Sequence, residues 1–95
     1  MNLQMTIETD MESFIAYGGQ TAFAFNISNA LFIDASRVKV TSVKKGSVII
    51  QYKIIESQKD NLEQLNSLLG QIIEYGMVEV GGPISSYGKV GEEMK

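Results

Sequence analysis

Two runs of alternating apolar residues, separated by a short turn, constrain the fold of this chain more than any other feature. Residues 38–41 and residues 48–54 each place an apolar side chain at every second position. That period is typical of strands with one buried face. The residues between the runs include Lys44, Lys45 and Gly46. The pattern therefore predicts a β-hairpin with these three residues as its loop.

The apolar pattern also predicts the register of this hairpin. Paired residues share a face of the sheet, so apolar Val40 is expected opposite apolar Ile50. A shorter, two-residue loop would place Val40 opposite polar Gln51, and the pattern rejects it. In the preferred register Gly46 lies at the loop position that needs left-handed backbone, which glycine adopts most easily. Turn chemistry alone accounts for Gly46 and for the serine that follows it.

Periodicity elsewhere predicts one strand and one helix on each side of the hairpin. The expected elements are a strand at residues 2–8, a helix at 20–32, a helix from Ser57 or Asp60 to 75 and a strand at 77–80. Two structures remain open for residues 10–17, an extended segment or a helical turn, and the glycines that follow are expected to form a loop.

The second expected helix has clear boundary and packing signals. Its apolar face is expected to consist of Leu62, Leu65, Leu69, Ile72 and Ile73. Ser57 or Asp60 can cap its first turn, because both side chains accept hydrogen bonds from backbone amides. Gly70 is expected to allow close approach of a neighbouring element, and Gly76 is expected to end the helix.

The order of these elements, β-α-β-β-α-β, indicates an α+β fold. The simplest topology is a ferredoxin-like sandwich, with a four-stranded antiparallel sheet in the order 4-1-3-2 and two helices on one face. We expect one domain at residues 1–82 and a C-terminal tail or linker at residues 83–95. The bare face of the sheet is expected to carry Val43 and Ile49 beside lysines, which suggests a contact with another protein.

Composition excludes several classes of function. The chain has no histidine and no cysteine, which removes the usual zinc ligands and the bases and nucleophiles of Ser-His and Cys-His catalysis. We therefore expect no metal, no cofactor and no enzyme of these kinds. A net charge of −3 argues against nucleic acid as a partner. No apolar run reaches the ~20 residues that span a bilayer, and no signal peptide pattern is present in this segment.

The hairpin turn also resembles a known motif. Gly46-Ser47-Val48-Ile49-Ile50 is similar to the Gly-Ser-Val-Val-Val signature of SEA domains, the βαββαβ modules of mucin-type and other cell-surface proteins. The residues around it, from 22 to 55, resemble a SEA-like pattern found in large surface and secreted proteins. This resemblance implies an extracellular or cell-surface location. It also implies self-cleavage between Gly46 and Ser47, in which the Ser47 hydroxyl attacks the Gly46 carbonyl.

Two functional hypotheses follow. The first is a non-catalytic structural or protein-interaction module of a longer surface or secreted chain, with self-cleavage at Gly46-Ser47 as an additional activity. Its partners would be another protein or neighbouring domains, and the sequon at Asn26 is a weak candidate for glycosylation that agrees with this location. The second hypothesis is a ferredoxin-like regulatory or assembly domain that self-associates or binds a small ligand. Its support is analogy of fold alone.

Overall fold

The computed structural model describes residues 1–45, 47–57 and 61–91 of the 95-residue chain. The elements in chain order are β1 Asn2–Ile7, α1 Met11–Tyr17, α2 Gly19–Leu31, the 3-10 turn η1 Ala35–Arg37, β2 Val38–Lys44, β3 Val48–Ile54, α3 Leu62–Glu74 and β4 Ile84–Lys89. The predicted α+β class is confirmed, and α2 lies within one residue of its expected bounds at each end.

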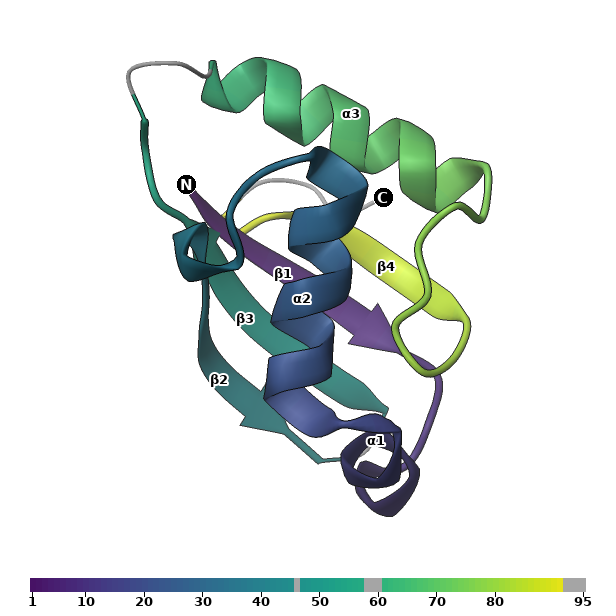
Figure 1. Cartoon of the computed structure of the whole chain (residues 1–95). Coiled ribbons are helices and arrows are strands. Elements are labelled where there is room, and N and C mark those ends of the chain that lie inside the picture. Colours follow the sequence, from purple (N-terminus) through teal and green to yellow (C-terminus); the bar gives the residue numbers. More distant parts are fainter. Residues whose placement is uncertain (46, 58–60, 92–95) are drawn as a thin grey trace.

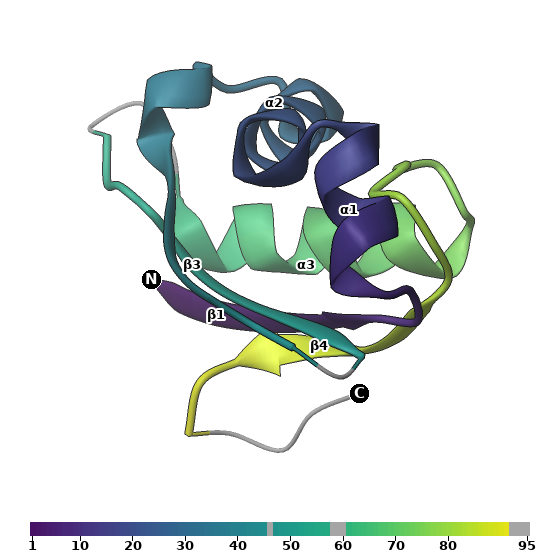
Figure 2. The ribbon, with the colours of Figure 1, turned by 90° about the horizontal axis from the view of Figure 1, so that it is seen from below.

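The sheet has four strands in the order β2-β3-β1-β4, and each neighbouring pair is antiparallel. From the opposite edge this order is β4-β1-β3-β2, so the neighbours are the expected ones. All three helices lie on one side of the sheet (Figure 2). Helix α2 crosses the sheet and contacts β2 (Figure 1). Helix α3 contacts β4, and the C-terminal part of α2 lies beside α3. Within residues 1–45, 47–57 and 61–91, the helices thus cover one face of the sheet, and no helix lies over the other, which we call the open face.

The core lies between this helical layer and the sheet. Strand β1 buries every second residue, as its sequence pattern predicts, and β3 does the same. The helices contribute one apolar face each. The buried apolar residues are Leu3, Met5, Ile7, Phe14, Phe23, Ile27, Leu31, Val38, Val48, Ile50, Tyr52, Ile54, Leu65, Leu69, Ile72 and Val80. Burial of these side chains from both layers is what holds the helices on the sheet.

The register predicted for the β2–β3 hairpin is wrong. Val40 pairs with Tyr52 and not with Ile50. Because the side-chain period of a strand is two residues, a slip of two keeps the same faces together, so the apolar pattern cannot separate these registers. Lys44, expected in the loop, belongs to β2 and pairs with Ile49.

A bulge at Thr41 changes which side chains face the core. Val40 and Ser42 pair with consecutive residues of β3, so Thr41 is an extra residue in its strand. Its Oγ1 donates a hydrogen bond to the carbonyl oxygen of Gln51 at 3.1 Å. After the bulge Val43 lies opposite buried Ile50 and packs against the core. The expectation that Val43 lies on the bare face of the sheet is therefore wrong.

The fourth strand is also not where the sequence predicted it. Residues 77–80 form no strand, although Val80 is buried and anchors this segment to the core. Strand β4 lies at Ile84–Lys89, within the segment 83–95 that was expected to be a tail, and pairs with β1. The Glu8 amide donates to the carbonyl of Pro83 at 2.7 Å and fixes where the strand begins.

Helix caps explain the remaining boundaries. The Asp10 carboxylate accepts a hydrogen bond from the Ser13 amide at 2.7 Å, so residues 11–17 form a helix. Asn61 caps α3 by accepting from the Glu63 amide at 2.9 Å, which corrects the expected cap at Ser57. The other expected cap, Asp60, lies outside the described residues.

Candidate functional site

The hydroxyl of Ser47 lies at the end of the sheet where β1 stops and β3 begins. Ile7 pairs with Val48, so the residue after β1 and the residue before β3 are neighbours. Ser47 Oγ donates a hydrogen bond to Oε2 of Glu8 at 3.0 Å. Gly46, the other half of the candidate cleavage site, lies outside the described residues.

Hydrogen bonds keep the Glu8 carboxylate ionised. The hydroxyl of Ser85 and then that of Ser47 hold the pKa of Glu8 below its usual value, because both donate to the charged form. The side chain is exposed to solvent. Glu8 is therefore a hydrogen-bond acceptor that orients the Ser47 hydroxyl and is at most a weak base.

The Asn26 sequon lies within α2. Asn26 itself is partly buried, and the next two residues, Ile27 and Ser28, are buried. The Ser28 hydroxyl donates a hydrogen bond to the carbonyl of Phe25 at 2.8 Å. Because the folded helix covers two of the three sequon residues, a glycan would have to be attached before α2 packs onto the sheet.

Neither a metal site nor a membrane span is found in the part of the chain that the structure describes. Within residues 1–45, 47–57 and 61–91 no three acidic side chains gather as metal ligands would. None of the helices in those ranges has the length and apolarity needed to cross a bilayer.

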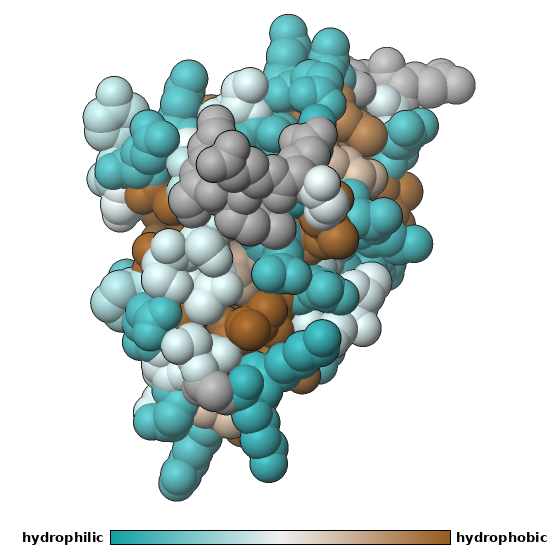
Figure 3. Space-filling view, turned by 180° about the vertical axis from the view of Figure 1, so that it is seen from behind, coloured by the Kyte–Doolittle hydropathy of each residue, from teal (hydrophilic) through white to brown (hydrophobic). Residues whose placement is uncertain are grey.

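The described residues of the open face of the sheet are mostly polar, and the half-buried Ile49, expected on this face, pairs there with Thr6 and Lys44. Where described residues are visible in Figure 3, hydrophilic and intermediate side chains surround smaller hydrophobic patches. Gln51 Nε2 donates to Gln4 Oε1 at 3.1 Å, and Ser86 Oγ donates to Thr6 Oγ1 at 3.0 Å. These cross-strand bonds satisfy the polar groups within the sheet.

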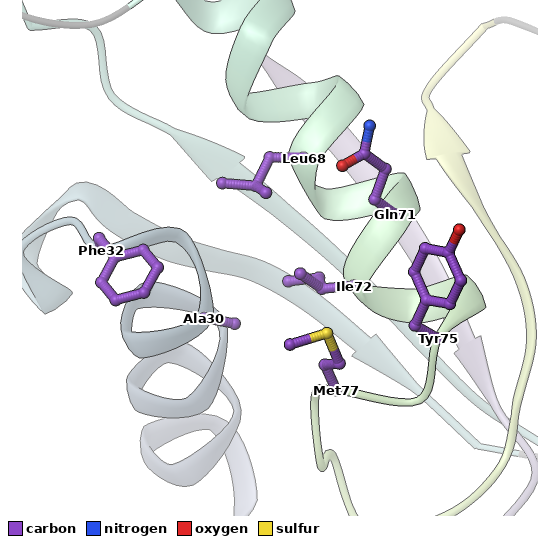
Figure 4. A pocket seen from close by; sticks show the side chains of 7 residues that line it. All are labelled: Ala30, Phe32, Leu68, Gln71, Ile72, Tyr75 and Met77. Carbon is purple, nitrogen blue, oxygen red and sulfur yellow. The ribbon is translucent and has the colours of Figure 1, made fainter.

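An apolar groove lies on the helical side, between the C-terminal end of α2 and the second half of α3. Its volume is about 470 Å³. The lining residues are Ala30, Phe32, Leu68, Gln71, Ile72, Tyr75 and Met77 (Figure 4). We call this surface the α2–α3 groove. Such a volume lies within the range of sites that hold a small molecule or a few side chains of a partner.

The most exposed large apolar side chains of the described residues gather at this groove. Phe32, Tyr75 and Met77 are 90%, 78% and 72% exposed, more than any other large apolar residue in those ranges. Single exposed apolar residues are ordinary on a protein surface. Three of them around one apolar hollow are typical of a binding site.

The backbone of Phe32 is unusual as well. It has φ 58° and ψ 40°, the left-handed region, and no other non-glycine residue among residues 1–45, 47–57 and 61–91 has a positive φ. Its amide donates to the carbonyl of Asn29 at 3.2 Å, and the Ile33 amide donates to that of Ser28 at 3.0 Å, which together end α2. Glycine is the usual residue at such a helix end. A phenylalanine there is strained by about 1 kcal/mol.

The end of α3 positions the opposite wall. Gly76 has φ 67°, and the Met77 amide donates to the carbonyl of Ile72 at 2.8 Å. This turn confirms the expected helix stop at Gly76. It also holds Met77 beside α3, where Figure 4 shows its side chain at the groove together with Tyr75. Sequence reasoning missed the groove, although two large apolar residues around a helix-ending glycine were a signal for it.

Comparisons of the chain with protein-family models, with curated proteins and with solved structures found no match. The groove and the Ser47–Glu8 pair are the two candidate functional features of the described residues.

Proposed function

We propose that this chain is a non-catalytic protein-interaction module, a SEA-like domain with a ferredoxin-like βαββαβ arrangement that belongs to a larger surface or secreted protein. The similarity of Gly46-Ser47-Val48-Ile49-Ile50 to the SEA signature supports the family. The sheet order, with α2 and α3 in the two crossovers, supports the arrangement, to which α1 is an addition. The domain binds its partner through the α2–α3 groove.

One observation carries the interaction function, the combination of strain and exposure at Phe32. Its backbone is left-handed, and its side chain is 90% exposed, so burial within the domain does not offset the strain. Glycine would fit this position better. Strained residues that their own fold does not need are concentrated at functional sites. A partner that covers Phe32 would supply the missing burial.

The groove also has the chemistry of an interface centre. Aromatic and methionine side chains are enriched where protein interfaces are fully desolvated, and a few such residues supply most of the binding energy. Phe32, Tyr75 and Met77 stand around an apolar floor formed by Leu68 and Ile72. These residues are on rigid elements or directly after them, so little ordering is needed on binding.

Selection from a random peptide library on the folded domain tests this function. We expect enriched peptides to perturb backbone amide signals of the groove residues in NMR spectra. They should bind Phe32→Ala at least about tenfold more weakly, as expected for a central aromatic anchor. Phe25→Ala is the matched control, because Phe25 is a half-exposed aromatic residue of the same helix that does not line the groove. Peptides that bind both variants equally well would contradict the proposal.

A second candidate activity is self-cleavage between Gly46 and Ser47. It is favoured by the hydrogen bond that holds the Ser47 hydroxyl at Glu8. In this reaction Ser47 Oγ bonds to the carbonyl carbon of Gly46, the bond from that carbon to the Ser47 nitrogen breaks, and an ester forms. The hydroxyl proton ends on the released amine. Water then hydrolyses the ester, giving a carboxylate at Gly46 and the free hydroxyl of Ser47.

Intact mass measured fresh and after days at neutral pH tests this activity. We expect fragments of residues 1–46 and 47–95 from the natural chain and none from Ser47→Ala. Glu8→Gln should slow cleavage, because an amide accepts the hydroxyl bond less strongly than a carboxylate does. An uncut natural chain would reject self-cleavage and leave the interaction function untouched.

The alternative hypothesis is that the chain is a ferredoxin-like regulatory or assembly domain that self-associates or binds a small ligand. Sedimentation of the isolated chain over a wide concentration range separates it from the proposed module. A monomer whose melting temperature does not respond to small apolar ligands agrees with the module. A dimer that Phe32→Ala dissociates would favour assembly instead.

A further inference from the structure

The segments that form the α2–α3 groove contain acidic residues and no basic ones. Residues 8–36 and 61–88 supply all three helices and all the groove residues, and they contain no lysine or arginine. The described cationic residues lie elsewhere, on η1, on the sheet and in the turn between β2 and β3. They are Arg37, Lys39, Lys44, Lys45, Lys53 and Lys89.

Each segment that forms the groove also carries a carboxylate close to its most exposed apolar residue. Asp34 follows Phe32 by two positions, Glu74 precedes Tyr75, and Glu79 follows Met77 by two positions. All three carboxylate residues are exposed. Hydrogen bonds from Ser36, whose amide donates to the Asp34 side chain at 2.9 Å, and then the positive charge of Arg37 hold the pKa of Asp34 below its usual value. Glu74 accepts a hydrogen bond from the Tyr87 hydroxyl on β4, and the charge of Arg37 acts on Asp34, so Glu79, two residues after Met77, is the carboxylate that adds most to the negative charge of the groove segments.

The helix ends add to this negative potential. Both α2 and α3 end at the groove, and neither has a basic residue in its last turn. A helix C-terminus carries a partial negative charge of about half an electron, which here is not neutralised by the helix's own side chains. Two such ends, in segments that carry no basic residue, favour a cationic ligand.

Arg37 and Lys89 are the cationic residues that follow these two segments directly in sequence. Arg37 Nε donates to the carbonyl of Ile55 at 3.0 Å, at the end of β3. Lys89 of β4 forms an ion pair with Glu63, at the opposite end of α3 from the groove.

We propose that the α2–α3 groove binds a cationic amphipathic segment of a partner protein, with apolar residues in the groove and lysine or arginine residues on its rim. This inference rests on the proposed interaction function and specifies the partner's chemistry. An amphipathic helix fits these conditions, because apolar residues spaced three and four apart form one face and can enter a groove together. The negative potential of the two helix ends and of the acidic groove segments also speeds association with a cationic segment and disfavours acidic ones.

A pair of synthetic peptides tests the inference. Each has about 15 residues, enough for a helix to form on binding, with leucine and phenylalanine at helical spacing. One carries lysine at all exposed positions, and the other carries glutamate there. NMR titration of the isotope-labelled domain gives the affinity and the location of binding. We expect the lysine peptide to shift the amides of Ala30, Leu68 and Met77, and to bind at least about tenfold more tightly than the glutamate peptide.

Charge variants locate the effect at the rim. Glu79→Gln should weaken the lysine peptide by about twofold to fivefold, as loss of a partly exposed charge pair does. Glu12→Gln is the matched control, because Glu12 lies on α1, away from the groove, and should leave affinity unchanged. Raising the salt concentration should weaken the lysine peptide, since exposed charges are screened.

Each contrary result has a distinct meaning. Equal or tighter binding of the glutamate peptide at the groove would overturn the cationic partner and keep the groove as an interaction site. Failure of both peptides to bind, while library peptides also fail, would overturn the inference and the proposed function together. Groove shifts that appear when the domain alone is concentrated would identify a second copy as the occupant and would also overturn the inference.

Discussion

At the residue scale, Tyr52 places a polar hydroxyl in the apolar core, just as Phe32 places an apolar ring in solvent. It is 1% exposed, and its hydroxyl has no hydrogen-bond partner among the described residues. Its ring packs edge to face on Phe23, with centroids 5.0 Å apart. Burial raises the pKa of Tyr52 far above its usual value, because the charged form would be desolvated. The ring of Tyr52 thus contributes to the core, whereas burial of its unpaired hydroxyl costs free energy.

Tyr52→Phe is therefore expected to raise the free energy of unfolding by about 1 kcal/mol, because a buried, unpaired hydroxyl is removed and the ring is kept. Urea unfolding monitored by circular dichroism measures the change. Tyr87→Phe is the control, since the Tyr87 hydroxyl donates to Glu74 Oε1 at 3.2 Å and gains nothing by removal. Loss of stability in Tyr52→Phe would show that the hydroxyl is bonded after all.

The helix cap at Asp10 is expected to make the stability of the domain depend on pH. Hydrogen bonds from Ser13 hold the pKa of Asp10 below its usual value. Because the pKa is lower in the folded state, the stabilisation is present above the unfolded value of about 3.9 and is lost as pH falls through the folded value. Asp10→Asn keeps the cap, so stability near pH 7 should change little, and the loss between about pH 7 and pH 3 should become smaller. Thermal unfolding at both pH values checks this, and an unchanged loss would contradict it.

At the element scale, Gly70 inside α3 and Gly76 just after its C-terminal end are expected to respond to substitution in opposite directions. A Cβ at Gly70 would lie 3.7 Å from Tyr87 Cε2 on β4, an ordinary contact. The close approach expected at Gly70 therefore leaves room for a methyl group. At Gly76 nothing lies within 4 Å of such a Cβ, but φ is 67°. The first glycine is dispensable, and the second is needed for its backbone.

Gly70→Ala should therefore stabilise the domain by about 1 kcal/mol, the difference in helix propensity between the two residues. Gly76→Ala should destabilise it by about 1 kcal/mol, because alanine is strained in left-handed backbone. Denaturant unfolding of both variants measures the two signs. Destabilisation by Gly70→Ala would mean that α3 and β4 are packed more tightly than the contact to Tyr87 indicates.

Strand β4 gives a prediction about where the domain ends. A chain truncated after residue 82 loses β4 and leaves the backbone of β1 without its second neighbour. We expect it to lose cooperative thermal unfolding. A chain truncated after residue 91 keeps every described pair of β4 and should unfold as the full chain does. Cooperative unfolding of the shorter chain at the same temperature would contradict the role given to β4.

The limits of sequence reasoning are also clearest for elements. Strand β1 and helix α3 could be predicted because each buries one continuous apolar face. Strand β4 could not, because in Ile84–Lys89 only Ile84 and Tyr87 are apolar and its partner β1 supplies most of the burial. The bulge at Thr41 could not be predicted either, because a single extra residue in a strand leaves no periodic pattern in the sequence. The groove was missed for a different reason, since it needs the ends of α2 and α3 to lie side by side, which only tertiary packing determines.

At the scale of the whole molecule, the sign of the charge differs between the helical layer and the β2–β3 part of the sheet. The helical layer is acidic and presents an apolar groove, whereas residues 37–54 contain five cationic residues and no acidic ones. Lysines on the edge strand β2 also discourage pairing with another sheet. One face is thus suited to a cationic amphipathic partner, and the sheet edge is protected from nonspecific association.

Comparison of Phe32→Gly with Phe32→Ala tests the central claim most directly. We predict that Phe32→Gly raises the free energy of unfolding by about 1 kcal/mol, because glycine relieves the left-handed strain, and that Phe32→Ala does not, because it keeps a Cβ there. Both variants should lose binding of the lysine peptide. A glycine variant that is more stable but cannot bind would show that Phe32 is kept for the partner. Unchanged binding in both variants, or no gain in stability with glycine, would contradict that account.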